Sequence, residues 1–263
     1  MNIFKKILLI SRPRIWIYTI GMFWIGVTIG THDPLAIFKG FFLPLSLYLT
    51  LPINIFIYAI NDVFDVETDK YNPKKDGFEF AAQKKDKLFL LYLAVVFLLP
   101  LPFIIIHMPT KVWILVSIWL FLVVSYNFPP LRWKAVPILD LLFAFNFPIW
   151  AMIGYLLSTG QLPQLFFIYI GVIFSIIMHL YTSSLDIDYD KKTNIHTTAT
   201  LFNTLHNNLL ICFILSVLTS VFLFVAGVYI VSIWFLMYGV FFFINMIFER
   251  YFLSKLLISK QLQ

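Results

Sequence analysis

Apolar residues fall in eight long runs that are separated by short polar segments. Each run is long enough, or nearly so, to cross the hydrocarbon core of a bilayer as a helix. Prolines in the second, third and fifth runs predict kinks rather than loops, because neighbouring helices can satisfy the freed backbone groups. The last two runs are almost continuous, so Tyr229 and the slightly earlier Gly227 are alternative positions for the turn between them. The predicted helices are Ile15–Gly30, Phe41–Ile60, Leu88–His107, Val112–Phe128, Ile138–Ser158, Leu165–Ser183, Leu209–Ile230 and Val231–Phe248.

The composition indicates a membrane protein. The 263 residues are 61% apolar and only 12% charged, with a mean hydropathy of +0.90, which is too little polar surface for a soluble globule. We therefore predict an all-α, multi-pass transmembrane bundle in contact with membrane lipid. It has eight predicted helices. The single cysteine, Cys212, excludes an internal disulfide framework and a cysteine-rich metal site.

The basic residues lie almost entirely on one side of the predicted helices. Of the 19 Lys and Arg residues, 17 precede the first helix, follow an even-numbered helix or lie in the C-terminal segment, and only Lys39 and Lys111 lie on the other side. The positive-inside rule then places both termini and the loops after the even-numbered helices in the cytoplasm. We expect a multi-pass protein of a prokaryotic plasma membrane. The net charge of +6 reflects this topology and does not indicate a nucleic-acid partner.

Two clusters of acidic residues directly follow predicted helices. At about 100° per residue, Asp62, Asp65 and Asp69 fall within roughly 60° of one another on a helix, whereas Glu67 points away. The second cluster has two aspartates one helical turn apart. These are Asp186 and Asp190. The clusters occupy equivalent places in two parallel four-helix pseudo-repeats, residues 15–130 and 138–250, of one domain spanning residues 1–263. They could face each other across a central cavity.

Carboxylates in this arrangement favour a magnesium-diphosphate site. Mg²⁺ takes one or two carboxylates per ion and leaves positions for phosphate oxygens. Lysines beside both clusters, Lys74 and Lys191 among them, are expected to bind the remaining oxygens. A solvated cap after each helix is the alternative explanation for the carboxylates.

A polar residue lies deeper in the second helix. Asn54 is seven positions before Asn61 and therefore on almost the same helical face. An unpaired amide in lipid is costly, so we expect Asn54 to point inward and to contact substrate. A hydrogen bond to a neighbouring helix would satisfy the amide equally well.

Both acidic motifs resemble signatures of one family. Asn61-Asp62-x-x-Asp65-x-x-x-Asp69 is similar to the first signature of the UbiA superfamily of intramembrane prenyltransferases, and Asp186-x-x-x-Asp190 resembles the second. The resemblance covers most of the chain. Members of the family usually have nine helices, so it implies either that the segment Val221–Leu257 divides differently or that the final helix is missing. It implies a helical bundle in which the aspartates hold two Mg²⁺ ions on the diphosphate of an allylic prenyl donor. It further implies that Asn61 contacts the donor, that Asp69 is a metal ligand, and that the remaining aspartates have both catalytic and metal-binding roles: Asp62, Asp65, Asp186 and Asp190.

Three further segments resemble the lycopene elongase type branch of this superfamily. They are Ser11-Arg12-Pro13-Arg14-Ile15-Trp16-Ile17-Tyr18, Thr197-Thr198-Ala199-Thr200, and Pro129-Pro130-Leu131-Arg132-Trp133-Lys134, which follows Ser125-Tyr126. Lys74 stands where the family often has Arg. The resemblance implies that these segments contribute substrate-binding residues, namely Arg14, Tyr126, Arg132 and Lys134.

The predicted function is Mg²⁺-dependent transfer of a prenyl group from an allylic prenyl diphosphate to a hydrophobic, lipid-soluble acceptor, a carotenoid or another polyisoprenoid. The first alternative is an aromatic acceptor of quinone biosynthesis. Aromatic-acceptor branches often have Tyr-x-x-x-Lys, whereas Tyr126 is followed at that spacing by Pro130. The second alternative is a membrane transporter or channel. A transporter would distribute carboxylates through the membrane depth, whereas here they concentrate at one face.

Overall fold

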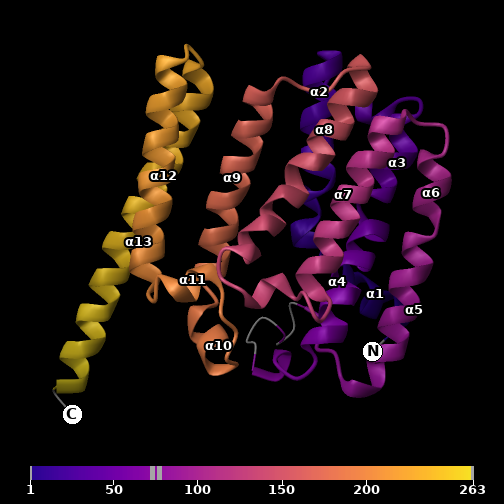
Figure 1. Ribbon diagram of the computed structural model, residues 1–263. Helices are drawn as coiled ribbons and strands as arrows, with labels where there is room; N and C mark the ends of the chain where they lie inside the picture. Colours follow the sequence, from indigo (N-terminus) through magenta and orange to yellow (C-terminus); the bar gives the residue numbers. More distant parts are fainter. Residues whose placement is uncertain (1, 72–74, 76–78, 262–263) are drawn as a thin grey trace. The chain divides into compact units, whose positions relative to one another are not determined.

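Every regular element in the described part of the chain is a helix (Figure 1). The structure is a computed structural model that describes residues 2–71, 75 and 79–261. The all-α, multi-pass prediction is confirmed. The α-helices are α1 Ile3–Ser11, α2 Ile20–Thr31, α3 Phe42–Tyr48, α4 Leu51–Asp65, α5 Lys87–Leu98, α6 Pro100–Ile105, α7 Thr110–Asn127, α8 Asn146–Thr159, α9 Leu165–Ser184, α10 Ile187–Lys192, α11 Thr198–Leu201, α12 Leu205–Val225 and α13 Tyr229–Gln261.

Seven helical segments in the described residues are long and apolar enough to cross a membrane. They start at Phe42, Lys84, Thr110, Leu139, Leu165, Leu205 and Tyr229. Their outer faces carry large apolar side chains, such as Leu165 and Ile230, which are 84% and 85% exposed. A surface of this kind is suited to lipid, because contiguous apolar patches of this extent are rare on soluble monomers.

The first predicted helix is divided, which accounts for seven such segments instead of eight. Its beginning forms a 3₁₀ helix, Pro13–Tyr18, and α2 follows with only 12 residues. Arg12 precedes the proline with a φ of 50°, so the backbone turns sharply after α1. Pro13 then starts the new helix with its φ already fixed.

The predicted kink in the second helix is a full break between α3 and α4. Pro52 lies in the first turn of α4, and the break leaves backbone carbonyls without helical partners. Two side chains satisfy them: Thr19 Oγ1 donates to the Leu49 carbonyl at 2.7 Å, and Asn54 Nδ2 donates to the Thr50 carbonyl at 2.5 Å. Side chains that satisfy freed backbone groups are what make such breaks tolerable in a membrane.

The final two helices form a hairpin. α12 ends at Val225 and α13 begins at Tyr229, with Gly227 between them at a φ of +79°. That conformation favours glycine, and it places the turn at one of the alternative positions that the sequence offered. Ser220 and Ser232 tie the two helices together through hydrogen bonds of 2.8 Å between each hydroxyl and the other residue's carbonyl. α13 continues to Gln261, well past the predicted end at Phe248.

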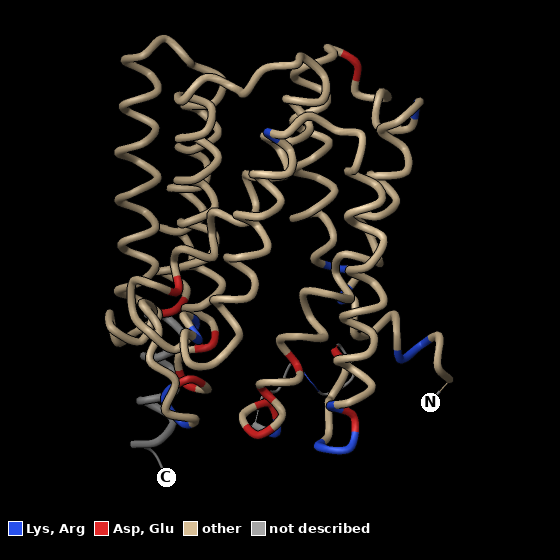
Figure 2. Tube along the Cα trace, turned by 45° about the vertical axis from the view of Figure 1, so that its right-hand side comes forward, with Lys and Arg blue, Asp and Glu red and all other residues tan. Residues whose placement is uncertain are grey.

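The chain forms two compact units. The first comprises Met1–Lys134 and Leu142–Ser175, and the second comprises Ala135–Leu141 and Ile176–Gln263. Within each unit, Figure 2 shows most charged residues gathered toward one end of the helices rather than spread along them. The predicted division into two four-helix pseudo-repeats within a single domain stays a prediction.

Close backbone contact between α2 and α8 organises the first unit. A Cβ atom on Gly26 would lie 2.0 Å from the Ala151 carbonyl oxygen, and one on Gly154 would lie 2.5 Å from the Phe23 carbonyl oxygen. Only glycine permits this approach, as at other close helix crossings in membranes. The packing fixes α8 against the N-terminal segment, which carries arginines of the candidate site.

Candidate active site

The last turn of α4 carries two buried carboxylates of the first signature. Asp62 is fully buried and Asp65 is 8% exposed. α4 ends at Asp65, so the helix does not continue to Asp69 as the sequence suggested; Asp69 instead begins a 3₁₀ turn, Asp69–Tyr71. Asp69 is nevertheless buried. Glu67 is exposed and pairs with Lys70 and Lys84 at 2.7 and 3.0 Å, as the helical spacing predicted for a residue on the opposite side.

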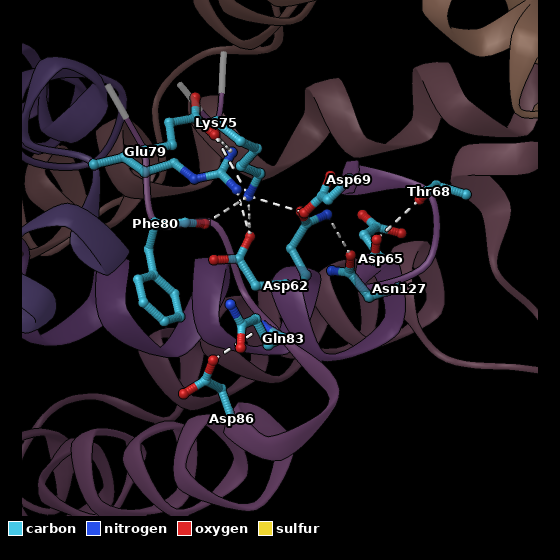
Figure 3. Close-up of polar contacts among 12 residues, drawn as sticks. Asp62, Asp65, Thr68, Asp69, Lys75, Glu79, Phe80, Gln83, Asp86 and Asn127 are labelled. Atoms are coloured by element: carbon cyan, nitrogen blue, oxygen red, sulfur yellow. Dashed lines mark hydrogen bonds and ion pairs between the residues drawn. The ribbon is translucent and has the colours of Figure 1, made fainter. Parts of the chain in front are cut away.

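Asp62 joins three segments of the chain. Its Oδ1 accepts hydrogen bonds from Arg12 Nη2 at 2.6 Å and from Lys75 Nζ at 2.8 Å. Lys75 Nζ also lies 2.9 Å from Asp69 Oδ2 and donates to the Phe80 carbonyl at 3.2 Å. Figure 3 shows the lysine amino group between Asp62 and Asp69. Lys75 therefore holds the two carboxylates on one side of the loop after α4.

Glu79 adds a carboxylate that the sequence reading missed. It is 5% exposed and accepts hydrogen bonds from Arg14 Nη2 and from Arg12 Nη1, the latter at 3.1 Å. Arg12 also stacks over the Tyr58 ring, 4.6 Å from its centroid. The Ser11–Tyr18 segment pointed to these arginines only through resemblance, and no sequence pattern singled out Glu79.

Asp65 binds the basic segment that follows α7. Lys134 Nζ lies 2.6 Å from both carboxylate oxygens of Asp65, and Arg132 Nη2 lies 3.4 Å from Oδ1. Beside this pair, Asn61 Nδ2 donates to Asn127 Oδ1 at 2.9 Å. α4, α7 and the loop after α7 thus bring three predicted site residues together: Asn61, Arg132 and Lys134.

Burial changes the protonation equilibria of three groups in the site. Burial raises the pKa of the Asp69 carboxyl to about 6, although Lys75 opposes the shift. Burial also lowers the pKa of Lys134, against the opposing effect of Asp65. For Arg12, burial lowers the pKa, but the carboxylates of Asp62 and Glu79 outweigh it and raise the pKa above its ordinary value. Arg12 is therefore a permanent cation.

Three buried polar atoms of this cluster lack both a hydrogen-bond partner and an ion pair among the described residues. They are the acceptor Asp62 Oδ2 and the donors Arg12 Nε and Arg132 Nε. Such atoms are costly unless a ligand satisfies them. No group of three or more His, Cys, Asp or Glu side chains in the described residues is placed to hold a metal ion, and the carboxylates pair instead with Lys and Arg. The metal ligands that the cluster offers are carboxylate oxygens, and one of them, Asp62 Oδ2, has no partner in the described part of the chain. Oxygen ligands of this kind fit Mg²⁺.

The second unit holds the other acidic motif. Asp186 immediately precedes α10, and the Asp190 amide donates to the Asp186 carbonyl at 2.8 Å, so the two lie one turn apart as predicted. Asp190 is buried and accepts a hydrogen bond from Thr197 Oγ1 at 3.3 Å. Asp188 is exposed. The Thr197–Thr200 segment, which resembles one branch of the superfamily, thus orients an aspartate of the second signature.

A second buried contact holds the same threonine segment. Asp140 accepts hydrogen bonds from the hydroxyl of Thr198 and from its backbone amide, the latter at 3.0 Å. Lys191, predicted to bind substrate, donates instead to the carbonyl and side chain of Asn203 at 2.7 and 2.6 Å.

The remaining predicted residues make other contacts or fall outside the described residues. The Tyr126 ring stacks on Phe143 with centroids 4.1 Å apart. Asn54 Nδ2 donates to Thr19 Oγ1 at 3.0 Å and to the Thr50 carbonyl at the break before α4. These bonds within the protein are the alternative that the sequence left open for this amide. Lys74 lies outside the described residues.

Comparisons with known proteins identify the family. The model of the UbiA prenyltransferase family matches residues 11–257. The chain is 34% identical over 197 residues to a lycopene elongase/hydratase of Halobacterium salinarum, covering 75% of this chain and 71% of that protein. It is 31% identical over 208 residues to a lycopene elongase/hydratase of Corynebacterium glutamicum, covering 76% of this chain and 70% of that protein.

A solved structure shares the fold. A UbiA homolog from Archaeoglobus fulgidus bound to DMAPP and Mg²⁺ has a TM-score of 0.70 to this chain at 18% identity, covering 91% of this chain and 86% of that one. The family match spans almost the whole chain, including both acidic motifs and all seven apolar helical segments. The chain therefore belongs to the UbiA prenyltransferase family and is a membrane-embedded prenyltransferase.

Proposed function

We propose that this enzyme transfers a prenyl group, in the presence of Mg²⁺, from an allylic prenyl diphosphate to a carotenoid or another polyisoprenoid. Relatives named lycopene elongase/hydratase support this acceptor, and homologs solved with DMAPP or GPP together with Mg²⁺ support the donor and the metal. The observation that carries the proposal is the buried cluster around Asp62. It leaves one oxygen acceptor, Asp62 Oδ2, and two guanidinium donors, Arg12 Nε and Arg132 Nε, without partners among the described residues.

The cluster provides more positive than negative groups for a diphosphate. Four carboxylates, Asp62, Asp65, Asp69 and Glu79, contact five cationic side chains, namely Arg12, Arg14, Lys75, Arg132 and Lys134. Arg12, Lys75 and Lys134 are largely buried, whereas Arg14 and Arg132 are partly exposed. Cationic side chains bind phosphate oxygens strongly, and arginine does so through its planar fork. The cations that now bind carboxylates are the groups that we assign to the donor diphosphate.

Mg²⁺ would be held by Asp62, Asp65 and Asp69 of the first signature and by Asp186 and Asp190 of the second, and it would neutralise the charge of the diphosphate oxygens. With a metal bound to these carboxylates, Lys75 and Lys134 would be available to the diphosphate. Thr197 would keep Asp190 oriented, since it already donates to that carboxylate. We also keep Asn54, Asn61, Lys74 and Lys191 as proposed substrate contacts.

The transfer step places its largest demand on the leaving group. The bond between the allylic carbon and oxygen breaks, and its electron pair leaves with the diphosphate. A double bond of the acceptor then supplies the electron pair for the new carbon–carbon bond, and a proton is lost. Fixed cations such as Arg12 and Lys134 stabilise the developing negative charge. The stacked rings of Tyr126 and Phe143 offer π faces, each able to stabilise a nearby cation by about 0.5–2 kcal/mol.

The acceptor is tested with purified protein in lipid nanodiscs. Radiolabelled dimethylallyl or geranylgeranyl diphosphate is supplied with Mg²⁺, and lycopene is compared with hydroxybenzoate and naphthoate acceptors. We expect label in an extended carotenoid, with none when EDTA replaces Mg²⁺. Label on the aromatic acids and none on lycopene would refute the carotenoid assignment in favour of quinone biosynthesis. Glu67→Gln, which changes an exposed carboxylate near the site, is the matched control and should retain activity.

The orientation in the membrane follows from the charge distribution. We propose that both termini and the C-terminal ends of α4 and α9 face the cytoplasm of a prokaryotic cell, because 17 of the 19 basic residues lie in the segments assigned to that side. A membrane-impermeant thiol reagent tests this in intact cells. A cysteine introduced at Lys39 should react, and one introduced at Lys84 should not; the opposite result would invert the topology. The native Cys212 is buried and gives little background.

A further inference from the structure

Glu79 lies outside both aspartate signatures but at the centre of the basic residues. Its Oε1 accepts a hydrogen bond from Arg14, and its Oε2 lies 3.1 Å from Arg12 Nη1 and 3.8 Å from Lys75 Nζ. Its side chain is 4% exposed. Each carboxylate oxygen thus binds a different arginine, so one side chain fixes two guanidinium groups relative to each other (Figure 3 shows Glu79 beside Lys75).

The partners of Arg12 differ in what they would do when the donor binds. Arg12 now contacts Asp62, Glu79 and the face of Tyr58. Asp62 belongs to the proposed metal-binding set, so its contact with Arg12 weakens when it turns to a metal. Glu79 belongs to neither signature and remains a fixed anionic partner throughout. Without it, the largely buried cations Arg12 and Lys75 would repel each other strongly, and the half-exposed Arg14 would lose its bond to Glu79.

Glu79 leaves the arginines able to bind a ligand. A guanidinium has five N–H donors, and Glu79 takes one from each arginine. Arg12 Nε, which is buried, has no partner in the described part of the chain. A guanidinium that is held at one edge and has an unused buried donor is preorganised for phosphate oxygens, because little side-chain freedom is lost on binding.

We infer that Glu79 is a positioning residue that holds Arg12 and Arg14 in place to bind the diphosphate of the prenyl donor. The inference rests on the proposed function, since it assigns a role within the same diphosphate site. It predicts that Glu79 acts on donor binding rather than on the bond-breaking step. Loss of Glu79 should therefore raise the donor KM and leave kcat nearly unchanged.

The experiment compares Glu79→Gln, Glu79→Asp and the control Glu67→Gln in the full-length protein in nanodiscs. Steady-state transfer gives KM and kcat for dimethylallyl diphosphate, and calorimetry gives the affinity for inorganic pyrophosphate with Mg²⁺. For Glu79→Gln we expect the donor KM to rise and the pyrophosphate affinity to fall by about tenfold each, the loss of one charge-assisted contact, with kcat within about twofold. Glu79→Asp keeps the charge on a shorter side chain, so its donor KM should rise severalfold but by less than in Glu79→Gln, and Glu67→Gln should match the wild type.

The outcomes separate this inference from the proposed function. Wild-type protein that neither binds pyrophosphate nor transfers a prenyl group overturns the proposed function and the role of Glu79 with it. The role of Glu79 alone is overturned if the wild-type protein binds pyrophosphate and transfers the prenyl group, but a folded Glu79→Gln variant has an unchanged or lower donor KM. If Glu79→Gln does not fold, Glu79→Asp decides: a donor KM raised severalfold at unchanged melting temperature supports positioning, and a wild-type KM refutes it.

Discussion

Asp62→Asn removes the fully buried carboxylate that joins α4 to two cations. Its Oδ1 lies 2.6 Å from Arg12 Nη2 and 2.8 Å from Lys75 Nζ. Breaking a buried ion pair by removing one partner typically costs about 3–5 kcal/mol of unfolding free energy. Glu79 and Asp69 still compensate part of the charge on these cations, so we expect about 3 kcal/mol. Transferase activity should fall by about 10²-fold or more, because the proposed metal ligand and its effect on the leaving group are lost.

A second substitution separates the loss of stability from the loss of activity. Adding Lys75→Met to Asp62→Asn removes a buried cation that has lost one of its two close carboxylate contacts, so the double variant should regain about 1–2 kcal/mol while activity stays low. Thermal unfolding in detergent measures the first quantity, and label transfer from dimethylallyl diphosphate measures the second. Glu67→Gln should be normal in both. Wild-type Mg²⁺-dependent transfer by folded Asp62→Asn protein would show that Asp62 has no catalytic or metal-binding role.

Three further predictions concern packing and charge. Gly154→Ala should lower the unfolding free energy by about 1–3 kcal/mol, because the new Cβ would lie 2.5 Å from the Phe23 carbonyl oxygen; an unchanged melting temperature would contradict this contact. Asp69→Asn should stabilise the Mg²⁺-free protein by up to about 3 kcal/mol at pH 8 and much less at pH 4. Burial raises the pKa of Asp69 from 3.8 to about 6, so the charged form destabilises the fold increasingly as the pH rises through this range; equal stabilisation at both pH values would refute the argument. Lys134→Met should cost about 3–5 kcal/mol, because it leaves the Asp65 carboxylate buried beside Arg132 alone, and melting unchanged from wild type would contradict that pair.

The sequence predicted the features that depend on local patterns. Hydropathy identified the helical segments, because a backbone in lipid must satisfy its own hydrogen bonds within a helix. Helical spacing placed Asp62 and Asp65 on one face and turned Glu67 away from it, and the structure has this arrangement. The motifs and their spacing also resembled the family to which the chain belongs, and the matched residues 11–257 bear this out.

Only the tertiary structure decided which charges meet. Arg12 and Asp62 are separated by 50 positions, and Arg14 and Glu79 by 65, so neither periodicity nor composition links them. Sequence patterns also did not show that the first predicted helix is divided, or that Asn54 satisfies a backbone carbonyl at the break before α4. Helix formation follows from interactions between near neighbours in sequence and can be read from the chain. The pairing of buried charges depends on how distant helices pack, because each ion pair forms only where folding brings its two residues out of water together.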